Sequence, residues 1–401
     1  MGGQAFAHLS PPLPTPRMPP SIYRQVLTST HALLQHHYRL VGSPIEAPGK
    51  DTFGDVDILV FDPKPDSPLN GITLSSRLGT QMAILLGAKH HIFEKGNPTM
   101  NFAVAWPREE GEAEGMRGGR GMGEGMESGK ERYIQLDIKV CESENMFQWE
   151  LFHAAHGDLW NILGSTIRKF GLTVNNLGMY LRIPEIELYD RKKSMVFLTD
   201  DYGQILEFFG VDKDKWWREF GSREEMFEYA AGCRMFWVKD LNEEVEEAED
   251  GSPEVTTEMG QEGGELGKKK LKHNDRVRMV KRPIFRQWME EFIPKCRADG
   301  RYADSKGVTR EEIRDEAFIE FGSAIKTTYE TKLKEWKLAK HTDDVWRDNI
   351  KGSIPDEGVD PQFRAAAIRT VKGVVMGGEE FEGKVVPEVA RDEDVSIPEY
   401  F

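Results

Sequence analysis

The chain has 401 residues, of which 68 are acidic and 53 are basic, so its formal net charge is −15. This length allows two or three domains with buried cores, while a uniformly acidic surface would exclude nucleic acid and anionic lipid as partners. The three cysteines show no CxxC spacing, which argues against a disulfide framework or a zinc site, and no apolar run is long enough to cross a membrane. We therefore expect a cytoplasmic or nuclear protein with no membrane partner.

The first predicted elements are a tail, a helix and a strand. Residues 1–20 are rich in proline and are predicted to form a flexible, disordered tail. Apolar residues at helical spacing run from Ser21, a candidate N-cap, through Leu40 and predict a helix. A loop that contains Gly42 and Ser43 follows, and the β-branched run over 55–61 predicts a strand.

The next stretch of chain alternates between short strands and turns. A helix is predicted over 73–86, and short strands over 90–94 and 100–106. Strict alternation over 132–140 predicts another strand. The segment 107–130 between the last two strands is rich in Gly and Glu and cannot bury enough apolar area to order itself. We therefore expect an insertion in the loop of an antiparallel hairpin.

Beyond residue 140 the pattern is mainly helical. Helical spacing over 146–170 and an aromatic-rich stretch over 223–238 flank strand candidates at 178–184 and 194–198. Together with the preceding elements, these predict that residues 21–238 form one folded region.

The negative charge is concentrated in two segments. Residues 240–265 hold 11 acidic and no basic side chains, and residues 375–401 hold eight acidic and two basic ones. Their composition predicts a disordered acidic linker over 239–267 and an acidic tail over 375–401, on either side of a helical C-terminal region over 268–374. Without these two segments the chain carries a net charge of +2, so an anionic ligand is not excluded.

Three aspartates carry the chemistry that the sequence suggests. Successive strand side chains point to opposite faces, so Asp55 and Asp57 share one face of their strand, and Asp137 lies at the middle of the half-buried strand 132–140. Mg²⁺ and Mn²⁺ prefer such oxygen ligands and would relieve the repulsion between the carboxylates. Three aspartates on adjacent strands can hold two ions, one activating a hydroxyl and one stabilising a leaving pyrophosphate.

Gly42 and Ser43 fit the same scheme. A glycine lets the backbone approach a phosphate, and the Ser43 hydroxyl can donate to one. Gly-Ser, about a dozen residues, Asp-x-Asp in a strand and a later strand aspartate together resemble the signature of the polymerase-beta-like nucleotidyltransferase superfamily. The resemblance covers roughly residues 21–140 and continues through about residue 238.

This resemblance implies both a fold and an activity. The implied fold is α+β, with a nucleotidyltransferase-type mixed sheet, flanking helices and a mostly helical C-terminal region. The implied activity is metal-dependent transfer of a nucleotidyl group from a nucleoside triphosphate such as ATP to an unidentified acceptor, with release of pyrophosphate. Gly42 and Ser43 would contact the triphosphate, Asp55 and Asp57 would bind both metal ions, and Asp137 would complete the site of the ion that activates the acceptor.

Two other interpretations remain open. The chain can be a catalytically inactive binding or regulatory protein that keeps this fold. Alternatively, Asp55 and Asp57 are edge-strand or loop acids beside a turn, and Asp137 pairs with a basic neighbour such as Arg132.

The basic segment 268–301 is a candidate for binding a nucleic-acid acceptor. It carries 12 Lys and Arg residues, interleaved with Phe285 and Trp288, which suits a phosphate track with stacking aromatics. The alternative is a helix whose aromatics enter the core and whose cations meet the acidic linker. The aromatic pairs 208–209 and 216–217 are predicted to be core.

Overall fold

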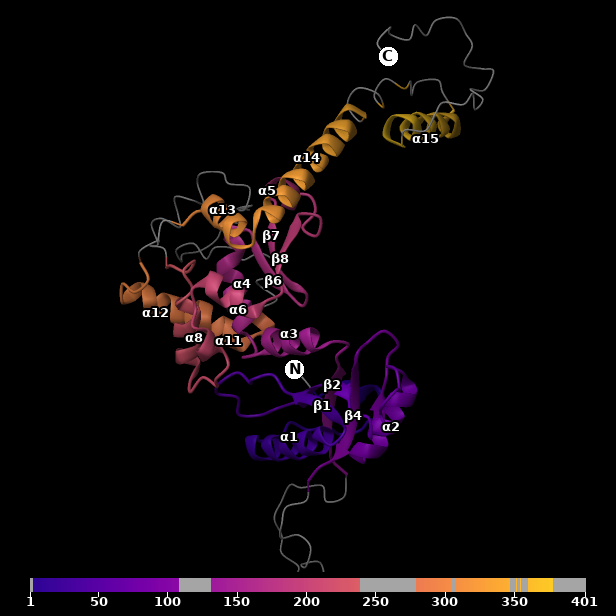
Figure 1. Ribbon diagram of the computed structural model, residues 1–401, viewed down its shortest axis with the longest axis vertical. Helices are drawn as coiled ribbons and strands as arrows, with labels where there is room; N and C mark the ends of the chain where they lie inside the picture. The colour runs from indigo at the N-terminus through magenta and orange to yellow at the C-terminus, as the bar shows by residue number, and fades with distance from the viewer. Residues whose placement is uncertain are drawn as a thin grey trace, which may run out of the picture. The chain divides into compact units, whose positions relative to one another are not determined.

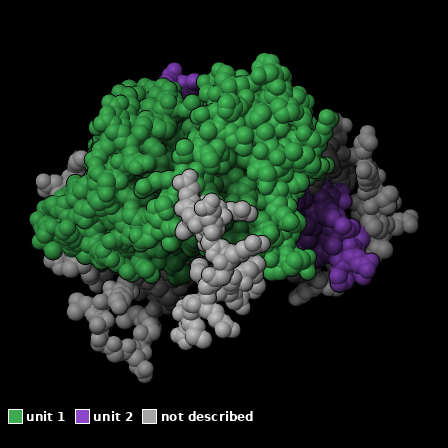
Figure 2. Space-filling view, turned by 90° about the horizontal axis from the view of Figure 1, so that it is seen from below, with its two compact units in different colours: residues 1–181, 197–321 green, residues 182–196, 322–401 purple. Residues whose placement is uncertain are grey.

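The computed structural model describes residues 3–107, 131–238, 279–303, 308–346, 351, 354 and 360–377. The chain divides into two compact units, one of residues 1–181 and 197–321 and the other of residues 182–196 and 322–401 (Figure 2). The predicted insertion, acidic linker and acidic tail lie almost entirely outside the described residues.

A five-stranded mixed sheet organises the N-terminal part of the first unit. Its order is β1-β2-β5-β4-β3, with β2 and β5 parallel and the other neighbours antiparallel. The predicted hairpin around the insertion is confirmed, because β4 and β5 pair from Thr99–Lys139 to Ala105–Tyr133. The strands are β1 (Tyr38–Gly42), β2 (Asp55–Pro63), β3 (His90–Ile92), β4 (Thr99–Ala105) and β5 (Tyr133–Val140).

Helices α1 (Pro20–Gln35) and α2 (Ser76–Leu86) cover one face of this sheet (Figure 1). The apolar side chains of β2 and β5 point to that face and form one buried cluster with both helices. Helix α2 ends as the sequence predicted, since Gly87 adopts the left-handed conformation with φ of 63°. The buried cluster contains Val56, Ile58 and Val60 of β2, Leu136 and Ile138 of β5, Leu34 of α1 and Met82 of α2.

The opposite face of the sheet has two parts. Asp55, Asp57 and Asp137 point to this side, as the alternation of each strand requires. Helix α3 (Glu144–Ala154) packs against the remainder through Phe147, which lies beside Leu59.

The first helix is shorter than its apolar pattern predicted. Helix α1 begins at Pro20, with Pro19 rather than Ser21 at the N-cap, and it ends at Gln35. Proline suits the first helical turn because no partner is needed there for its missing N–H. The apolar residues from Tyr38 onward form strand β1 instead, because pairing with β2 buries Tyr38 in the same core.

Residues 3–19 pack against the sheet, whereas the sequence predicted a flexible tail. Phe6, in a short 3₁₀ helix (Ala5–His8), is fully buried against Ala103 and Tyr133. Met18 and Phe53 exchange two backbone hydrogen bonds of 2.7 and 2.9 Å. The prediction of disorder rested on the proline-rich composition and did not consider Phe6 and Met18, whose burial holds the segment on the sheet.

We expect Phe6→Ala to lower the free energy of unfolding by about 3–5 kcal/mol, because it empties a fully buried aromatic site. Denaturant unfolding of the full chain measures this change. The control is His8→Ala, which removes an exposed side chain from the same 3₁₀ helix. Equal stability of the Phe6 variant and the wild type would contradict the packing of this segment.

The rest of the first unit is mainly helical around an aromatic core. Phe208, Phe209 and Trp216 are buried there, so the core role predicted for the aromatic pairs holds for these three, while Trp217 is partly exposed. A second sheet has the order β6-β7-β8. The elements are α4 (Leu159–Ile167), η2 (Arg168–Phe170), β6 (Leu172–Asn175), β7 (Gly178–Arg182), β8 (Met195–Thr199), α6 (Tyr202–Phe209), α7 (Lys213–Trp216), α8 (Arg223–Ala231), α11 (Pro283–Gln287), a π-helical turn (Trp288–Phe292), α12 (Ile293–Ala298) and α13 (Arg310–Glu320).

The second unit contains three helices, α5 (Pro184–Glu187), α14 (Ser323–Val345) and α15 (Pro361–Gly377), among its described residues. The rings of Tyr189 and Trp336 lie 5.4 Å apart and link the chain after α5 to α14. The C-terminal part is thus helical, as the sequence predicted. Among the helices described in either unit, none combines the length and the apolar character that crossing a membrane requires.

Candidate functional site

The three aspartates predicted as metal ligands lie on one face of two neighbouring strands. Asp57 of β2 stands directly opposite Asp137 of β5, and Asp55 stands opposite Gln135. Neighbouring strands are about 4.8 Å apart, so the three residues are close in the sheet. Strand β2 lies between β1 and β5, which makes the edge-strand interpretation of Asp55 and Asp57 wrong.

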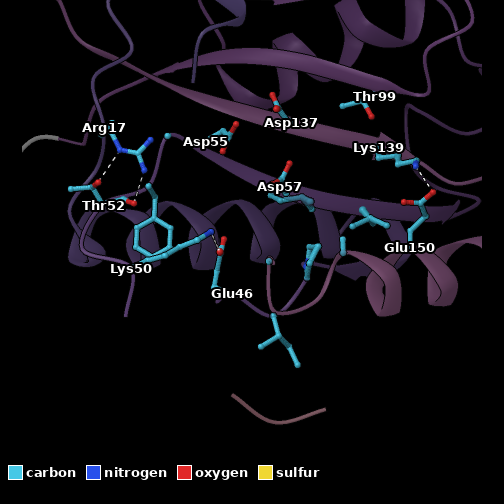
Figure 3. Close-up of a pocket in the computed structure, with 18 residues that line it drawn as sticks. Arg17, Glu46, Lys50, Thr52, Asp55, Asp57, Thr99, Asp137, Lys139 and Glu150 are labelled. Carbon is cyan, nitrogen blue, oxygen red and sulfur yellow. Dashed lines mark hydrogen bonds and ion pairs between the residues drawn. The ribbon is translucent and has the colours of Figure 1, made fainter. Parts of the chain in front are cut away.

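These aspartates line a cavity of about 450 Å³ (Figure 3). The loop 44–54 that joins β1 to β2, the N-terminal segment and α3 contribute the rest of its wall. Carboxylates outnumber cations in the lining, so the cavity favours a positively charged ligand. The charged lining residues are Glu46, Asp55, Asp57, Asp137 and Glu150 against Arg17, Lys50 and Lys139.

Two of the aspartates have hydrogen-bond donors. The Gly3 N–H donates to Asp55 Oδ2 over 3.1 Å. Asp137 Oδ1 accepts from Asn101 Nδ2 at 2.7 Å and from Gln135 Nε2 at 2.9 Å. The alternative in which Asp137 pairs with Arg132 is wrong, because the Arg132 guanidinium lies over the Trp106 ring instead.

Asp57 is the carboxylate with the most perturbed environment of the three. In the part of the chain that the structure describes, no donor reaches its carboxylate. The Asp57 side chain is exposed to the cavity, yet the surrounding protein displaces much of the bulk solvent, and Asp55 and Asp137 add negative charge. Desolvation first, and then these two neighbours, raise the pKa of Asp57 to about 7. Burial also raises the pKa of Asp137, against the opposing effect of its amide donors.

The donor chemistry of the cavity fits Mg²⁺ or Mn²⁺, since every acidic group supplies hard oxygen ligands. The side chains are not arranged as a closed metal site, however. Within the described ranges, no group of three or more His, Cys, Asp or Glu side chains could hold a metal ion as it stands. Asp55 and Asp137 are turned toward the amide donors of Gly3, Asn101 and Gln135.

Gly42 and Ser43 lie beside the cavity rather than in its wall, and the first residue of their loop that lines it is Pro44. The Ser43 hydroxyl donates to the Asp57 carbonyl oxygen at 2.6 Å, and His31 Nε2 lies 2.8 Å from the same hydroxyl. A Cβ at Gly42 would stand 3.0 Å from the Phe147 ring, so glycine lets α3 approach β1. Both residues therefore have structural roles, and their contact with a triphosphate stays a prediction.

Sequence reasoning missed Arg17, which reaches the cavity from the N-terminal segment. Its Nε donates to Thr52 Oγ1, and its Nη2 donates to the Thr52 carbonyl oxygen, both at 2.8 Å. The available signal was the spacing of the apolar anchors Phe6 and Met18 within the proline-rich stretch. The alternation of strand 132–140 had already placed Lys139 on the face of Asp137, and its ammonium pairs with Glu150 at 2.5 Å.

The described part of the basic segment 268–301 resembles a packed helix more than a stacking surface. Phe285 and Trp288 are buried, with the Trp288 ring 4.8 Å from that of Phe292. These aromatics therefore follow the core alternative. Residues 268–278 lie outside the described chain.

The cations of this segment are partly matched by acids of the fold. Each of these pairs joins the segment to α8 or to the start of α4. The pairs are Arg282 with Asp158 at 3.1 Å, Lys295 with Glu224 at 2.9 Å and Arg301 with Glu228 at 2.5 Å.

Comparison of the chain with protein-family models found no match, and comparison with curated proteins found none either.

Proposed function

We propose that the chain is a metal-dependent nucleotidyltransferase with a polymerase-beta-like fold, which uses a nucleoside triphosphate and an acceptor not yet identified. The observation that carries this proposal is the pairing of Asp57 with Asp137 on parallel strands, with Asp55 on the same face of an acidic cavity. The sheet topology also supports it, because the resemblance implies a mixed sheet. In this sheet β1 and β2 form an antiparallel pair and β5 lies parallel to β2.

In this proposal the oxygen of the acceptor forms a bond to the α-phosphorus of the triphosphate. The bond from that phosphorus to the oxygen that bridges to the β-phosphate breaks, pyrophosphate leaves with the electron pair, and the acceptor proton passes to a nearby carboxylate or to water. A bound Mg²⁺ or Mn²⁺ supplies charge neutralisation and lowers the pKa of the attacking hydroxyl.

The residues of the chain divide this work among them. Asp55 and Asp57 would hold the metal ions, and Asp137 would complete the ion site beside the acceptor. The amides of Asn101 and Gln135 orient the Asp137 carboxylate and restrict its rotation. The Ser43 hydroxyl holds the loop after β1 against the backbone of Asp57.

A second candidate is a binding or regulatory protein that keeps the fold without the chemistry. The internal hydrogen bonds of Asp55 and Asp137 favour it, because both carboxylates are satisfied by protein donors. Calorimetry with each nucleoside triphosphate separates the candidates at the binding step. Affinity that requires Mg²⁺ or Mn²⁺ is expected of the transferase, and its absence favours the regulatory protein.

The direct test is a screen of the four nucleoside triphosphates with Mg²⁺ or Mn²⁺, in which pyrophosphate release is followed and the labelled acceptor is identified by mass. Metal-dependent release is expected from the wild type and from Asp62→Asn. The Asp62 substitution makes the same chemical change on strand β2, at an exposed ion pair with Arg39 outside the cavity. Asp57→Asn is the matched variant within the cavity. Equal release by Asp57→Asn and wild type would refute the assignment.

A further inference from the structure

The cations that line the cavity differ in how their charge is balanced. Lys50 pairs with Glu46, and Lys139 pairs with Glu150. Arg17 bonds to the hydroxyl and the carbonyl oxygen of Thr52, which are both neutral. Of the three cations in the cavity wall, Arg17 alone has no carboxylate partner among the described residues. The positive charge at its end of the cavity is therefore not neutralised by the described protein.

The backbone holds Arg17 in place. The neighbouring residue Met18 is fully buried and exchanges two backbone hydrogen bonds with Phe53, so the segment is tied to the loop before β2. On the other side of Arg17, Thr15 Oγ1 donates to the Gly3 carbonyl oxygen at 2.5 Å, and the Gly3 N–H donates to Asp55. The segment that carries Arg17 is thus joined through Gly3 to Asp55, one of the three aspartates of the cavity.

Thr52 also orients the guanidinium. The Nε and one Nη2 hydrogen are directed at Thr52, and within the described chain the Nη1 group has no acceptor. A planar fork held in this way loses little conformational freedom when it binds a phosphate through two parallel hydrogen bonds. Arg17 therefore presents a pre-oriented anion-binding group at one end of the cavity.

The charges are separated along the cavity. Figure 3 shows Arg17 and Thr52 at one end, Lys139 and Glu150 at the other, and the three aspartates between them. A ligand that fits both the three aspartates and Arg17 must have oxygens that bind the metal ions, and it must carry further negative charge beside them. A polyphosphate has this chemistry, because one phosphate can share the metal ions with the aspartates while another reaches the guanidinium.

We propose that Arg17 binds the phosphates of the nucleoside triphosphate that leave as pyrophosphate, which makes the N-terminal segment part of the substrate site. The naming of the triphosphate as the ligand rests on the proposed function. Lys50 and Lys139 contribute less, because a phosphate would have to compete with their glutamate partners.

The test uses the full chain and inorganic tripolyphosphate with Mg²⁺, a probe that needs neither base recognition nor an acceptor. Calorimetry is expected to show binding to the wild type, and Arg17→Ala is expected to raise the Kd about tenfold or more, the loss typical of a charge-assisted phosphate contact. Arg17→Lys keeps the charge but not the fork, so it is expected to restore only part of the affinity. Arg24→Ala, which removes an exposed arginine of α1 outside the cavity, is the control and should bind as the wild type does.

The outcomes separate this inference from the proposed function. If the wild type transfers nucleotides and Arg17→Ala binds tripolyphosphate as tightly as the wild type, the role of Arg17 is refuted and the transferase stands. If the wild type transfers no nucleotide in the screen but Arg17→Ala weakens tripolyphosphate binding, the phosphate site stands and the transferase does not. A wild type that does not bind tripolyphosphate overturns the inference. In the transfer assay, Arg17→Ala should raise the KM for the triphosphate more than it lowers kcat.

Discussion

Asp57→Asn is expected to lower the rate of nucleotidyl transfer by about 10³-fold or more, a loss comparable with that of other groups that stabilise charge in a transition state. The same substitution is expected to raise the melting temperature of the metal-free protein near pH 8. The asparagine side chain would keep the shape of the aspartate but remove a charge that faces Asp55 and Asp137 without a described donor. Pyrophosphate release and thermal unfolding measure the two effects on one preparation.

Two variants sharpen this result. Asp62→Asn changes an exposed aspartate on the same strand and should leave both the rate and the melting temperature close to wild type, since exposed ion pairs contribute little. Asp137→Asn should lose the rate without the gain in stability, because Asn101 and Gln135 would lose their carboxylate acceptor. A melting temperature that falls in Asp57→Asn would show that its charge is compensated in the native protein.

Mg²⁺ is expected to stabilise the protein more strongly at about pH 8 than at about pH 6. The pKa of Asp57 lies near 7 in the folded chain and near its ordinary value of 3.8 in the unfolded chain. Between these values the folded state binds more protons, so the contribution of Asp57 to stability is present at low pH and is lost as pH rises through about 7. In the proposed site, a bound divalent cation would replace the proton above that pH and restore the stability.

Thermal unfolding with Mg²⁺ and with a chelator, each at both pH values, tests this expectation. In the wild type, Mg²⁺ should raise the melting temperature more at about pH 8 than at about pH 6. This difference should be smaller in Asp57→Asn, because asparagine has no proton that a metal ion could replace. A shift of the same size at both pH values in the wild type would contradict the assignment of Asp57 as a metal ligand whose pKa is raised.

The sequence predicted the central part of the sheet because its signals there are strong and local. The alternation in 132–140 and the β-branched run 55–61 each specify which side chains face the core, and this places Asp55, Asp57 and Asp137 on a common side. The register between the strands is not local, however. That Gln135 lies opposite Asp55 and donates to Asp137 follows from pairing between residues far apart in the chain, which no periodicity reveals.

The errors have physical reasons too. The apolar spacing that continues past Gln35 is compatible with a helix, but pairing with β2 makes residues 38–42 a strand, so tertiary contacts override the local pattern. The proline-rich composition of residues 3–19 indicates disorder only when no apolar anchor finds a pocket. Phe6 and Met18 are both fully buried, and the segment that they hold in place brings Arg17 to the cavity.

The packing of the N-terminal segment also sets an order of events during synthesis. The Ala5 N–H donates to Gln135 Oε1, a partner 130 residues later in the chain. Ala5 and its neighbours therefore cannot reach their native position until β5 has emerged, several seconds after them at about 5–20 residues per second. Closing so long a loop is slow and comes after local structure has formed. The end of the segment that carries Ala5 and Phe6 is thus placed late in folding, whereas Arg17 bonds to Thr52, only 35 residues later in the chain, and needs no residue of β5.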